Sequence, residues 1–477
     1  MLRPWELNVH LDANGQKPVY LQIADAIIVD IQSGRLKKGT ALPGSRKLAL
    51  DLKVNRNTVI EALNVLLNEG WLIAKNRKGT FVADVLPVLR PVKEEAIAHQ
   101  VVTESGVIPG IVIDDGHPDS KIAPIDELAR AYRQIFRRKA RWKMMGYTGQ
   151  TGDPEFRKAI SNMLSHQRGL KISENNVCIT RGSQMAMYLA AHVLLEKGDA
   201  IIVENPGYKP AWEVFESAGA KLLLVGVDEE GLSIEEVKQH LKKRKKIKAI
   251  YTTPHHQYPT TVTLSLQRRL ELIQLSNQYG FTVIEDDYDN EFHFGCRPVL
   301  PLASFQDLKS YVYIGTLSKV VAPSLRTGYL VSSDDIVQKA GNMRKLIDVQ
   351  GDNIMEQAIL ELINTGSVRR HLRRANVFYK LKRDYFTGLL DKYLSSEVSY
   401  TIPEGGLAVW LKLRNPLDFA WLETQLQEKG ISLNVPGSFY YNNHGIQGFR
   451  FGYASLSEQK LHEAVETIAG VLSRRPR

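Results

Sequence analysis

Two hydrophobic stretches of the chain end in side chains that can do chemistry. The first, FTVIEDDYD, places Asp286 and Tyr288 two residues apart, so that in a strand both point to the same face. The second, YVYIGTLSK, ends in Thr316, Ser318 and Lys319. Ligands of parallel sheets bind where the carboxyl ends of the strands meet, so we expect a carboxylate, a phenol, hydroxyls and an amine to converge there.

These groups match the needs of pyridoxal 5'-phosphate. A lysine forms a Schiff base with it, an acid keeps its pyridine nitrogen protonated and a phenol hydrogen-bonds its ring hydroxyl, roles that Lys319, Asp286 and Tyr288 can fill. Arg326 follows, and its guanidinium fork suits the phosphate together with the nearby hydroxyls. Alternatively, the acidic run 285–291 is a Mg²⁺ site or a solvated strand end, and Lys319 is an ordinary surface lysine.

Two upstream loops complete the predicted cofactor site. In ITRGSQ, a strand turns into a helix at Gly182, Ser183 and Gln184, whose backbone N–H groups can hold a phosphate. The single glycine does not match the dinucleotide fingerprint, so a dinucleotide is disfavoured. In VENPGYKPAW, Tyr208 can stack on the cofactor ring.

The head of the chain carries a pattern typical of DNA-binding modules. Apolar residues at helical spacing predict three helices, with Ser45 and Asn55 as N-caps of the second and third. The segments WLIA, KNRKG and TFVAD predict a β-hairpin with a basic tip. Residues 35–78 hold ten Lys or Arg and three Asp or Glu, which is most of the formal net charge of +10.

A helix that starts with basic and amide side chains suits a major groove, and a basic wing can reach phosphates or the minor groove. The alternative is a three-helix scaffold with a solvated basic face. This pattern predicts DNA contacts by Arg56, Asn57 and Thr58 of the helix and by Lys78 of the wing.

The elements that must position these side chains fall into three segments. We assign residues 1–83 to a winged helix-turn-helix head, 84–110 to a linker and 111–477 to the body. In the body, β-branched runs alternate with amphipathic stretches, which predicts an α/β fold with a mostly parallel sheet and helices on both faces. LAVWLKL and GFRFGYA predict strands of a smaller C-terminal subdomain.

Composition narrows the class of protein. Of 477 residues, 43% are hydrophobic and 24% charged, as in globular proteins of two or three domains. The longest apolar run is too short for a membrane span, the N-terminus has no secretory pattern, and two cysteines form no disulfide framework. We therefore expect a cytoplasmic protein without membrane contact. His255 and His256 lack an evident third ligand, so we expect no metal.

The head resembles the winged-helix domain of the GntR family, whose members bind double-stranded DNA. The matching residues are Tyr20-x-Gln22-Ile23, Gly34-x-Leu36, Leu42-Pro43, Ser45-Arg46, Leu48-Ala49, Val54-x-Arg56-x-Thr58-Val59, Glu69-Gly70 and Gly79-Thr80-Phe81-Val82. Asn55 stands where a serine is more usual. The resemblance implies that Arg46, Arg56 and Gly79 contact DNA.

The body, from about residue 111 to 470, resembles the fold-type I, aspartate-aminotransferase-like proteins. The matching residues are Tyr147 with Gly149-x-x-Gly152, Gly182-Ser183-Gln184, Asn205-Pro206-Gly207-Tyr208, Asp286-x-Tyr288, Thr316-x-Ser318-Lys319, Arg326-x-Gly328 and Arg450. The resemblance implies that Lys319 holds the cofactor, Asp286 its pyridine nitrogen and Tyr288 its hydroxyl. Tyr258 departs from the pattern, because it replaces the asparagine of an Asn-Pro-Thr-Gly turn, which fits a sensor better than an efficient catalyst.

A GntR-like head fused to such a body resembles the architecture of the MocR-type transcriptional regulators. The resemblance implies a homodimer with each head docked on the partner's body, an operator, and an effector that is an amino compound or a vitamin B6 vitamer. The alternative function is a working aminotransferase whose head tethers it to DNA, and a residual transamination half-reaction is open in either case.

Arg450, in GFRFGYA, has two interpretations. Its neighbours Phe449 and Phe451 should face the core, and an arginine in that setting is typically a structural ion-pair partner. By resemblance, Arg450 instead matches the aminotransferase arginine that binds a substrate carboxylate through two hydrogen bonds. In that case the effector is an amino acid or carries a comparable anionic group.

Overall fold

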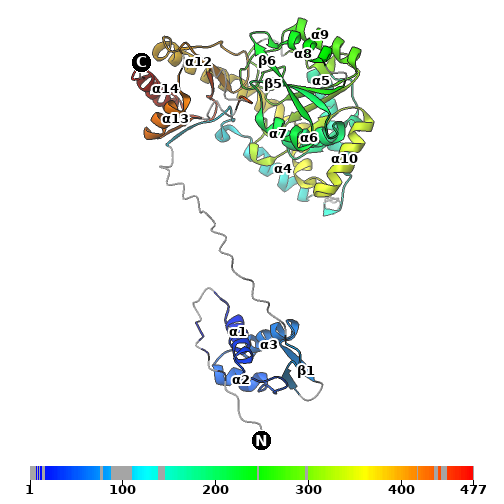
Figure 1. Ribbon diagram of the computed structural model, residues 1–477, viewed down its shortest axis with the longest axis vertical. Helices are drawn as coiled ribbons and strands as arrows, with labels where there is room; N and C mark the ends of the chain where they lie inside the picture. Colours follow the sequence, from blue (N-terminus) through cyan, green and yellow to red (C-terminus); the bar gives the residue numbers. More distant parts are fainter. Residues whose placement is uncertain are drawn as a thin grey trace. The chain divides into compact units, whose positions relative to one another are not determined.

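The computed structural model describes residues 7, 9, 11–12, 17–75, 79–86, 110–137, 145–243, 246–295, 299–415, 417–433, 439–441 and 448–475. The chain divides into two compact units, Met1–Glu104 and Ser105–Arg477 (Figure 1). Among the described residues, no helix is long and apolar enough to cross a membrane. The domain limits at 83 and 110 stay predictions.

The first unit is a three-helix bundle with a two-stranded hairpin. Its elements are α1 (Val19–Gln32), α2 (Ser45–Leu52), α3 (Arg56–Asn68), β1 (Leu72–Lys75) and β2 (Gly79–Val82). The strands pair antiparallel, and the apolar faces of the three helices share one core that includes Ile27, Val59 and Leu66. The winged-helix prediction is confirmed.

One of the two predicted helix caps is wrong. Asn55 caps α3 as predicted, since its Oδ1 accepts a hydrogen bond from the backbone N–H of Asn57 at 2.9 Å. Ser45 does not cap α2: the helix starts at Ser45 itself, and the extended residue before it is Gly44. A residue inside the first turn cannot act as the N-cap, and the Ser45 hydroxyl instead accepts from Arg56 Nε at 3.4 Å.

The second unit is built on an eight-stranded sheet with the order β4-β11-β10-β9-β8-β5-β6-β7. The strands are β4 (Val177–Thr180), β5 (Ala200–Asn205), β6 (Lys221–Asp228), β7 (Gly231–Leu232), β8 (Ile247–Thr252), β9 (Thr282–Asp287), β10 (Tyr311–Thr316) and β11 (Gly328–Val331). Strands β6, β5, β8, β9 and β10 are mutually parallel, whereas β11 runs antiparallel to β10 and β4, and β7 to β6. The mostly parallel sheet is confirmed.

Helices cover both faces of this sheet (Figure 1). On one face lie α6 (Ser183–Leu194), α7 (Lys209–Ser217) and α10 (Asp334–Asp348); on the other lie α4 (Ile125–Arg137), α5 (Pro154–Arg168), α8 (Ile234–Lys243), α9 (Leu266–Tyr279) and α11 (Asn353–Asn364). Alternate residues of one strand enter opposite cores: Ile201 and Val203 join the first, and Ile202 joins the second. Short 3₁₀ turns occur at Ser120–Ile122, Glu174–Asn176, Leu302–Ser304 and Pro323–Leu325.

A smaller C-terminal subdomain follows, as predicted. It contains α12 (Ser367–Tyr393), α13 (Phe419–Glu428), α14 (Glu458–Leu472) and the antiparallel strands β12 (Val398–Ser399), β13 (Ala408–Leu413) and β15 (Gly448–Gly452). Phe449 and Phe451 are buried in its core. The early strand β3 (Ile111–Ile113) pairs with β14 (Ile431–Leu433), which places the residues after β3 beside β15, where Gly452 N–H donates to Asp114 O at 2.8 Å.

Candidate functional site

One cavity of the body, of about 180 Å³, collects most of the residues predicted for the cofactor. It lies at the carboxyl ends of β9 and β10, as expected for a parallel sheet. Eight of the ten predicted cofactor residues line it: Ser183, Tyr208, Asp286, Tyr288, Thr316, Ser318, Lys319 and Arg326. Gly182 stands next to the lining, and Gln184 turns away, because its Nε2 donates to Pro210 O at 3.3 Å.

Asp286, near the end of β9, has a buried carboxylate oxygen without a partner. The residue is 3% exposed, its Oδ2 accepts from the Tyr251 hydroxyl at 3.0 Å, and Oδ1 has no hydrogen bond within the described residues. Burial raises the pKa of Asp286 to about 7, against the opposing effects of the Tyr251 hydrogen bond and the Lys319 charge. A buried acceptor without a donor is costly, and a protonated pyridine nitrogen is a donor of the required kind.

The other acidic residues of this strand end have structural partners. Asp287 points to the opposite face, where it pairs with Arg168 and accepts from the Tyr313 hydroxyl at 2.7 Å. Glu285, on the same face as Asp287, accepts from Leu302 N–H at 2.9 Å. The strand end is therefore buried and hydrogen-bonded, which excludes the alternative of a solvated acidic end.

The turn after β10 aims an amine and a hydroxyl into the cavity. Lys319 Nζ donates to the carbonyl oxygen of Gly116 at 3.1 Å. Ser318 Oγ is buried and has no partner among the described residues. The Thr316 hydroxyl donates to Thr327 O at 3.2 Å and accepts from Ser318 N–H at 3.1 Å, so Thr316 stabilises the turn that carries Lys319.

Gly182 and Arg326 lie against each other at one end of the cavity. Gly182 has a φ of +82°, and a Cβ there would lie 2.9 Å from Arg326 Nη2, so glycine lets the guanidinium lie against the start of α6. Helix α6 begins at Ser183, and its free N–H groups with the positive end of its dipole favour a phosphate. The partnerless Ser318 hydroxyl, the free Asp286 oxygen, the amine and this cradle together fit pyridoxal phosphate.

Tyr208 and Tyr288 supply the aromatic part of the cavity wall. Tyr288 also donates its hydroxyl to His256 O at 2.8 Å, and its ring centroid lies 4.7 Å from Lys319 Nζ. Tyr208 meets the Tyr258 ring edge-on, with 5.0 Å between centroids. The predicted stacking role of Tyr208 and the ring-hydroxyl contact of Tyr288 stay predictions.

Arg450 lies behind the cavity rather than in its lining. It is 1% exposed, and its Nε donates to Asp115 O at 2.6 Å, Nη1 to Pro259 O at 2.9 Å and Nη2 to the Tyr288 hydroxyl at 3.3 Å. The guanidinium carbon is 5.0 Å from the Tyr258 ring centroid. All three nitrogens thus donate to protein acceptors, which favours the structural interpretation, and the carboxylate-binding role stays a prediction.

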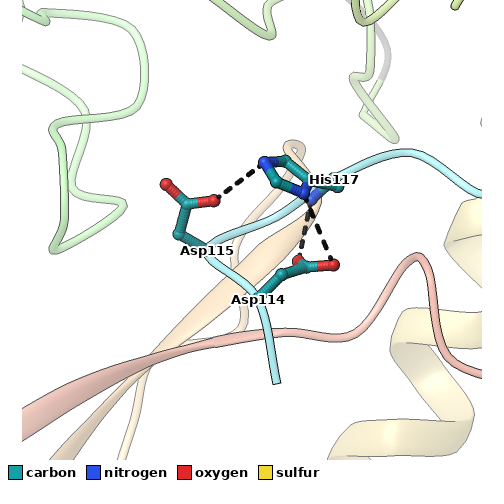
Figure 2. Close-up of side chains that lie close together, drawn as sticks. All are labelled: Asp114, Asp115 and His117. Carbon is teal, nitrogen blue, oxygen red and sulfur yellow. Dashed lines mark hydrogen bonds and ion pairs between the residues drawn. The ribbon is translucent and has the colours of Figure 1, made fainter. Parts of the chain in front are cut away.

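A turn that no sequence pattern indicated closes one side of the cavity. Asp115 and His117 of this turn line the cavity, and Figure 2 shows the His117 ring between the carboxylates of Asp114 and Asp115. His117 Nε2 lies 3.3 Å from Asp115 Oδ1, and Nδ1 lies 3.8 Å from Asp114 Oδ2. Strand-end reasoning could not indicate this turn, since it follows β3, which belongs to another sheet.

Hydrogen bonds within the protein explain this cluster without an ion, although its ligand atoms lie within 4.8 Å of one another. Asp114 Oδ1 accepts from two backbone N–H groups of the turn, at 2.7 and 2.9 Å, and its Oδ2 accepts from the Ser455 hydroxyl at 2.6 Å. Asp115 Oδ2 accepts from the Tyr258 hydroxyl at 2.8 Å. We infer no metal site here.

In the head, the residues predicted to contact DNA lie on α2, on α3 and on the hairpin. Arg46, Arg56, Asn57 and Gly79 are exposed, and Thr58 is half-buried. Lys78 lies outside the described residues. An exposed arginine and amide at the first turn of α3 agree with a recognition helix, while each individual contact stays a prediction.

Comparison with known proteins matches both units to families. Residues 116–468 match aminotransferase class I and II, and residues 19–82 match the bacterial regulatory proteins of the gntR family. A probable rhizopine catabolism regulatory protein MocR of Rhizobium meliloti is 28% identical, over 96% of this chain and 94% of its own. Aromatic-amino-acid aminotransferase 1 of Thermococcus litoralis is 27% identical, over 75% of this chain and 87% of its own.

A solved structure shows the same likeness in three dimensions. LysN, the alpha-aminoadipate aminotransferase of Thermus thermophilus, complexed with N-(5'-phosphopyridoxyl)-L-leucine, superposes with a TM-score of 0.70 at 27% identity, covering 76% of this chain and 92% of that chain. Fold and site thus define a pyridoxal phosphate protein with an aminotransferase fold. The chain belongs to the class I and II aminotransferase family and, with its gntR-type head, has the architecture of the MocR-type transcriptional regulators.

The raised pKa of Asp286 leads to a prediction for the Asp286→Asn variant. Because the folded protein favours the neutral carboxyl, the stability from this group is full below its ordinary pKa of 3.8 and is lost as the pH rises through about 7. The amide removes this loss but cannot hold a proton on the cofactor. We therefore expect the cofactor-free variant to be more stable than the cofactor-free wild type at about pH 8, and to bind the cofactor more weakly at that pH.

Thermal unfolding of the cofactor-free proteins at about pH 5 and about pH 8 checks this prediction, with cofactor titrations alongside. The increase in unfolding temperature of the variant over the wild type should be larger at the higher pH. Asp126→Asn, which removes an exposed carboxylate on α4, is the matched control. An equal increase in unfolding temperature at both pH values would contradict the assignment of a raised pKa to Asp286.

Proposed function

We propose that this chain regulates transcription by sensing an amino compound at the cofactor of its body, and that its head binds a double-stranded DNA operator. The observation that carries the proposal is a cavity fitted to pyridoxal phosphate in the same chain as an exposed recognition helix. Its target is DNA, so we propose a cytoplasmic location. A vitamin B6 vitamer is the second candidate signal.

The chain's own residues hold the cofactor and leave one side of it for the effector. When bound, the cofactor supplies an aldehyde that reacts reversibly with primary amines. The Asp286 oxygen without a partner would accept a hydrogen bond from the protonated pyridine nitrogen, and Arg326 with the start of α6 would bind the phosphate. Gly116 O orients the Lys319 amine. An effector amine competes with Lys319 for the same position.

A homodimer would couple effector binding in the body to DNA binding by the heads. Exposed apolar side chains lie on two segments of the body, one around residue 146 and one at the end of α10. A hydrogen bond from the Thr148 hydroxyl to Gln350 Oε1, at 3.2 Å, links the two segments. These side chains are Met145, Tyr147, Leu346, Ile347 and Val349. Exposed apolar patches of this kind mark protein interfaces. We propose that a second copy of the chain covers this patch in a head-to-tail homodimer, in which the head of each copy docks on the body of the other. An effector that changes the body then changes the spacing of two heads.

A working aminotransferase is the second candidate function, favoured by the matched catalytic lysine and acid and by the enzymes among the relatives. The two functions differ in turnover. Purified protein is incubated with saturating amino donors and keto-acid acceptors, and keto-acid production is followed together with operator binding. We expect an effector-dependent shift in operator binding with at most one turnover per cofactor. Sustained production without any effect on DNA binding would favour the enzyme.

A further inference from the structure

Asp115 is a charged residue of the cavity to which the cofactor gives no role. Among the described lining residues, the carboxyl, amine and guanidinium groups belong to Asp115, Asp286, Lys319 and Arg326. The last three serve the pyridine nitrogen, the aldehyde and the phosphate. Asp115 precedes Gly116, whose carbonyl oxygen accepts from Lys319 Nζ at 3.1 Å, and the Lys319 charge lowers the pKa of Asp115, so the two side chains lie close together in the cavity wall.

Asp115 is ionised and has room for another donor. Burial alone would raise the pKa of Asp115, but the charges of Lys319, Arg450 and His117 outweigh burial and hold the pKa below its ordinary value. An ionised carboxylate offers about four acceptor positions. Tyr258 and His117 occupy at most two of them. The side chain is 25% exposed, so a ligand can reach it.

The same wall is unsuited to a carboxylate. An anionic group beside Asp115 would meet a like charge, and Arg450, the arginine matched to carboxylate binding, is buried behind the lining with all three nitrogens donating to protein acceptors. Tyr258 contributes to this arrangement, because its hydroxyl binds Asp115 and its ring lies against Arg450. Tyr258 and Asp115 thus lie between Arg450 and the cavity, and the Asp115 carboxylate presents a negative charge to the cavity.

We propose that the effector site selects a diamine, with one primary amine at the position of the Lys319 amine and the second ammonium group paired with Asp115. This inference rests on the proposed function, since it names the class of molecule that the body senses. A charge-assisted hydrogen bond to a partly buried carboxylate supplies the selectivity. The closeness of Asp115 to the Lys319 amine requires that the two nitrogens be joined by a short chain.

Three probes of similar length test the inference with the cofactor-loaded protein. Putrescine, butylamine and γ-aminobutyrate share a primary amine and end in an ammonium, a methyl and a carboxylate group. Affinities are measured by calorimetry and by the cofactor's absorbance, and operator binding is measured on the same samples. We expect putrescine to bind about tenfold or more tightly than butylamine, and γ-aminobutyrate to bind more weakly than either.

Asp115→Asn tests the residue itself. The variant should lose most of the preference for putrescine over butylamine and should bind γ-aminobutyrate better than the wild type does. Cofactor content is measured in every sample, and Asp126→Asn controls for the removal of a carboxylate elsewhere on the body. His117→Gln, which keeps a polar side chain beside Asp115, should retain the preference for putrescine.

Several outcomes would overturn the inference. Tighter binding of γ-aminobutyrate than of putrescine, equal binding of all three probes or no binding of any would each do so. An undiminished preference in Asp115→Asn would show that another group reads the second ammonium, and loss of cofactor in that variant would place Asp115 in the cofactor site instead. Failure of the proposed function looks different: the wild-type protein would lack bound cofactor or would not bind its operator under any condition.

Discussion

Lys319→Ala should abolish the borohydride-reducible bond between the protein and its cofactor. Among the described residues that line the cavity, Lys319 is the single lysine, and its Nζ donates to Gly116 O at 3.1 Å. Cofactor should still enter the variant through Arg326 and Asp286, with lower affinity and without a covalent bond. The covalent bond through Lys319 and the non-covalent binding through Arg326 and Asp286 can therefore be measured separately.

The measurement is borohydride reduction followed by mass spectrometry of the intact protein. Wild-type protein should gain one phosphopyridoxyl group per chain and Lys319→Ala none, while absorbance shows that the variant still binds cofactor reversibly. Lys339→Ala, which removes an exposed lysine paired with Asp335 on α10, is the matched control and should behave as the wild type does. Labelling of the Lys319 variant at wild-type stoichiometry would disprove the assignment.

Sequence patterns were sufficient for the parts of the site that depend on one strand. Alternation along β9 predicted that Asp286 and Tyr288 share a face, and both line the cavity, whereas Asp287 between them contacts Arg168 and Tyr313 on the opposite face. The carboxyl-edge rule brought the ends of β9 and β10 together, although these strands are separated by a long connection. Both rules use only local periodicity and sheet direction.

The features that the sequence did not indicate depend on contacts between distant segments. Asp115 reaches the cavity because β3 pairs with β14, which lies far along the chain, and no local pattern marks that pairing. Tyr251, which donates to Asp286, looks like any buried aromatic residue of a strand. The cap of α2 was misplaced for a smaller reason: Gly44 and Ser45 are both acceptable N-caps, so propensity could not choose between them.

Loss of sequence-selective DNA binding is the second large effect that we expect, in Arg56→Ala. Arg56 is the first residue of α3 and is exposed, and its Nε contacts the Ser45 hydroxyl at 3.4 Å, so the side chain is held near the junction of the two helices. An arginine in this place can bind a guanine edge through two hydrogen bonds, and losing such a contact costs about 1–3 kcal/mol and relaxes specificity.

A matched variant distinguishes this role from a general charge effect. Lys75, at the end of β1 in the wing, is exposed and also carries one positive charge. If it contacts a phosphate, Lys75→Ala should weaken operator and unrelated DNA alike and should reduce the slope of log affinity against log salt by about one. Arg56→Ala should instead reduce operator affinity by roughly 10- to 100-fold while leaving unrelated DNA bound nearly as before.

Titrations of both variants against operator and scrambled DNA, at several salt concentrations, separate these outcomes. Circular dichroism of each variant checks that α3 remains folded, since the Asn55 cap and the apolar face of the helix are untouched. Equal losses on operator and scrambled DNA in Arg56→Ala would make Arg56 a phosphate contact. Specificity would then have to come from other side chains of the same exposed turn, beginning with Asn57, whose backbone N–H binds the Asn55 cap while its side chain is exposed.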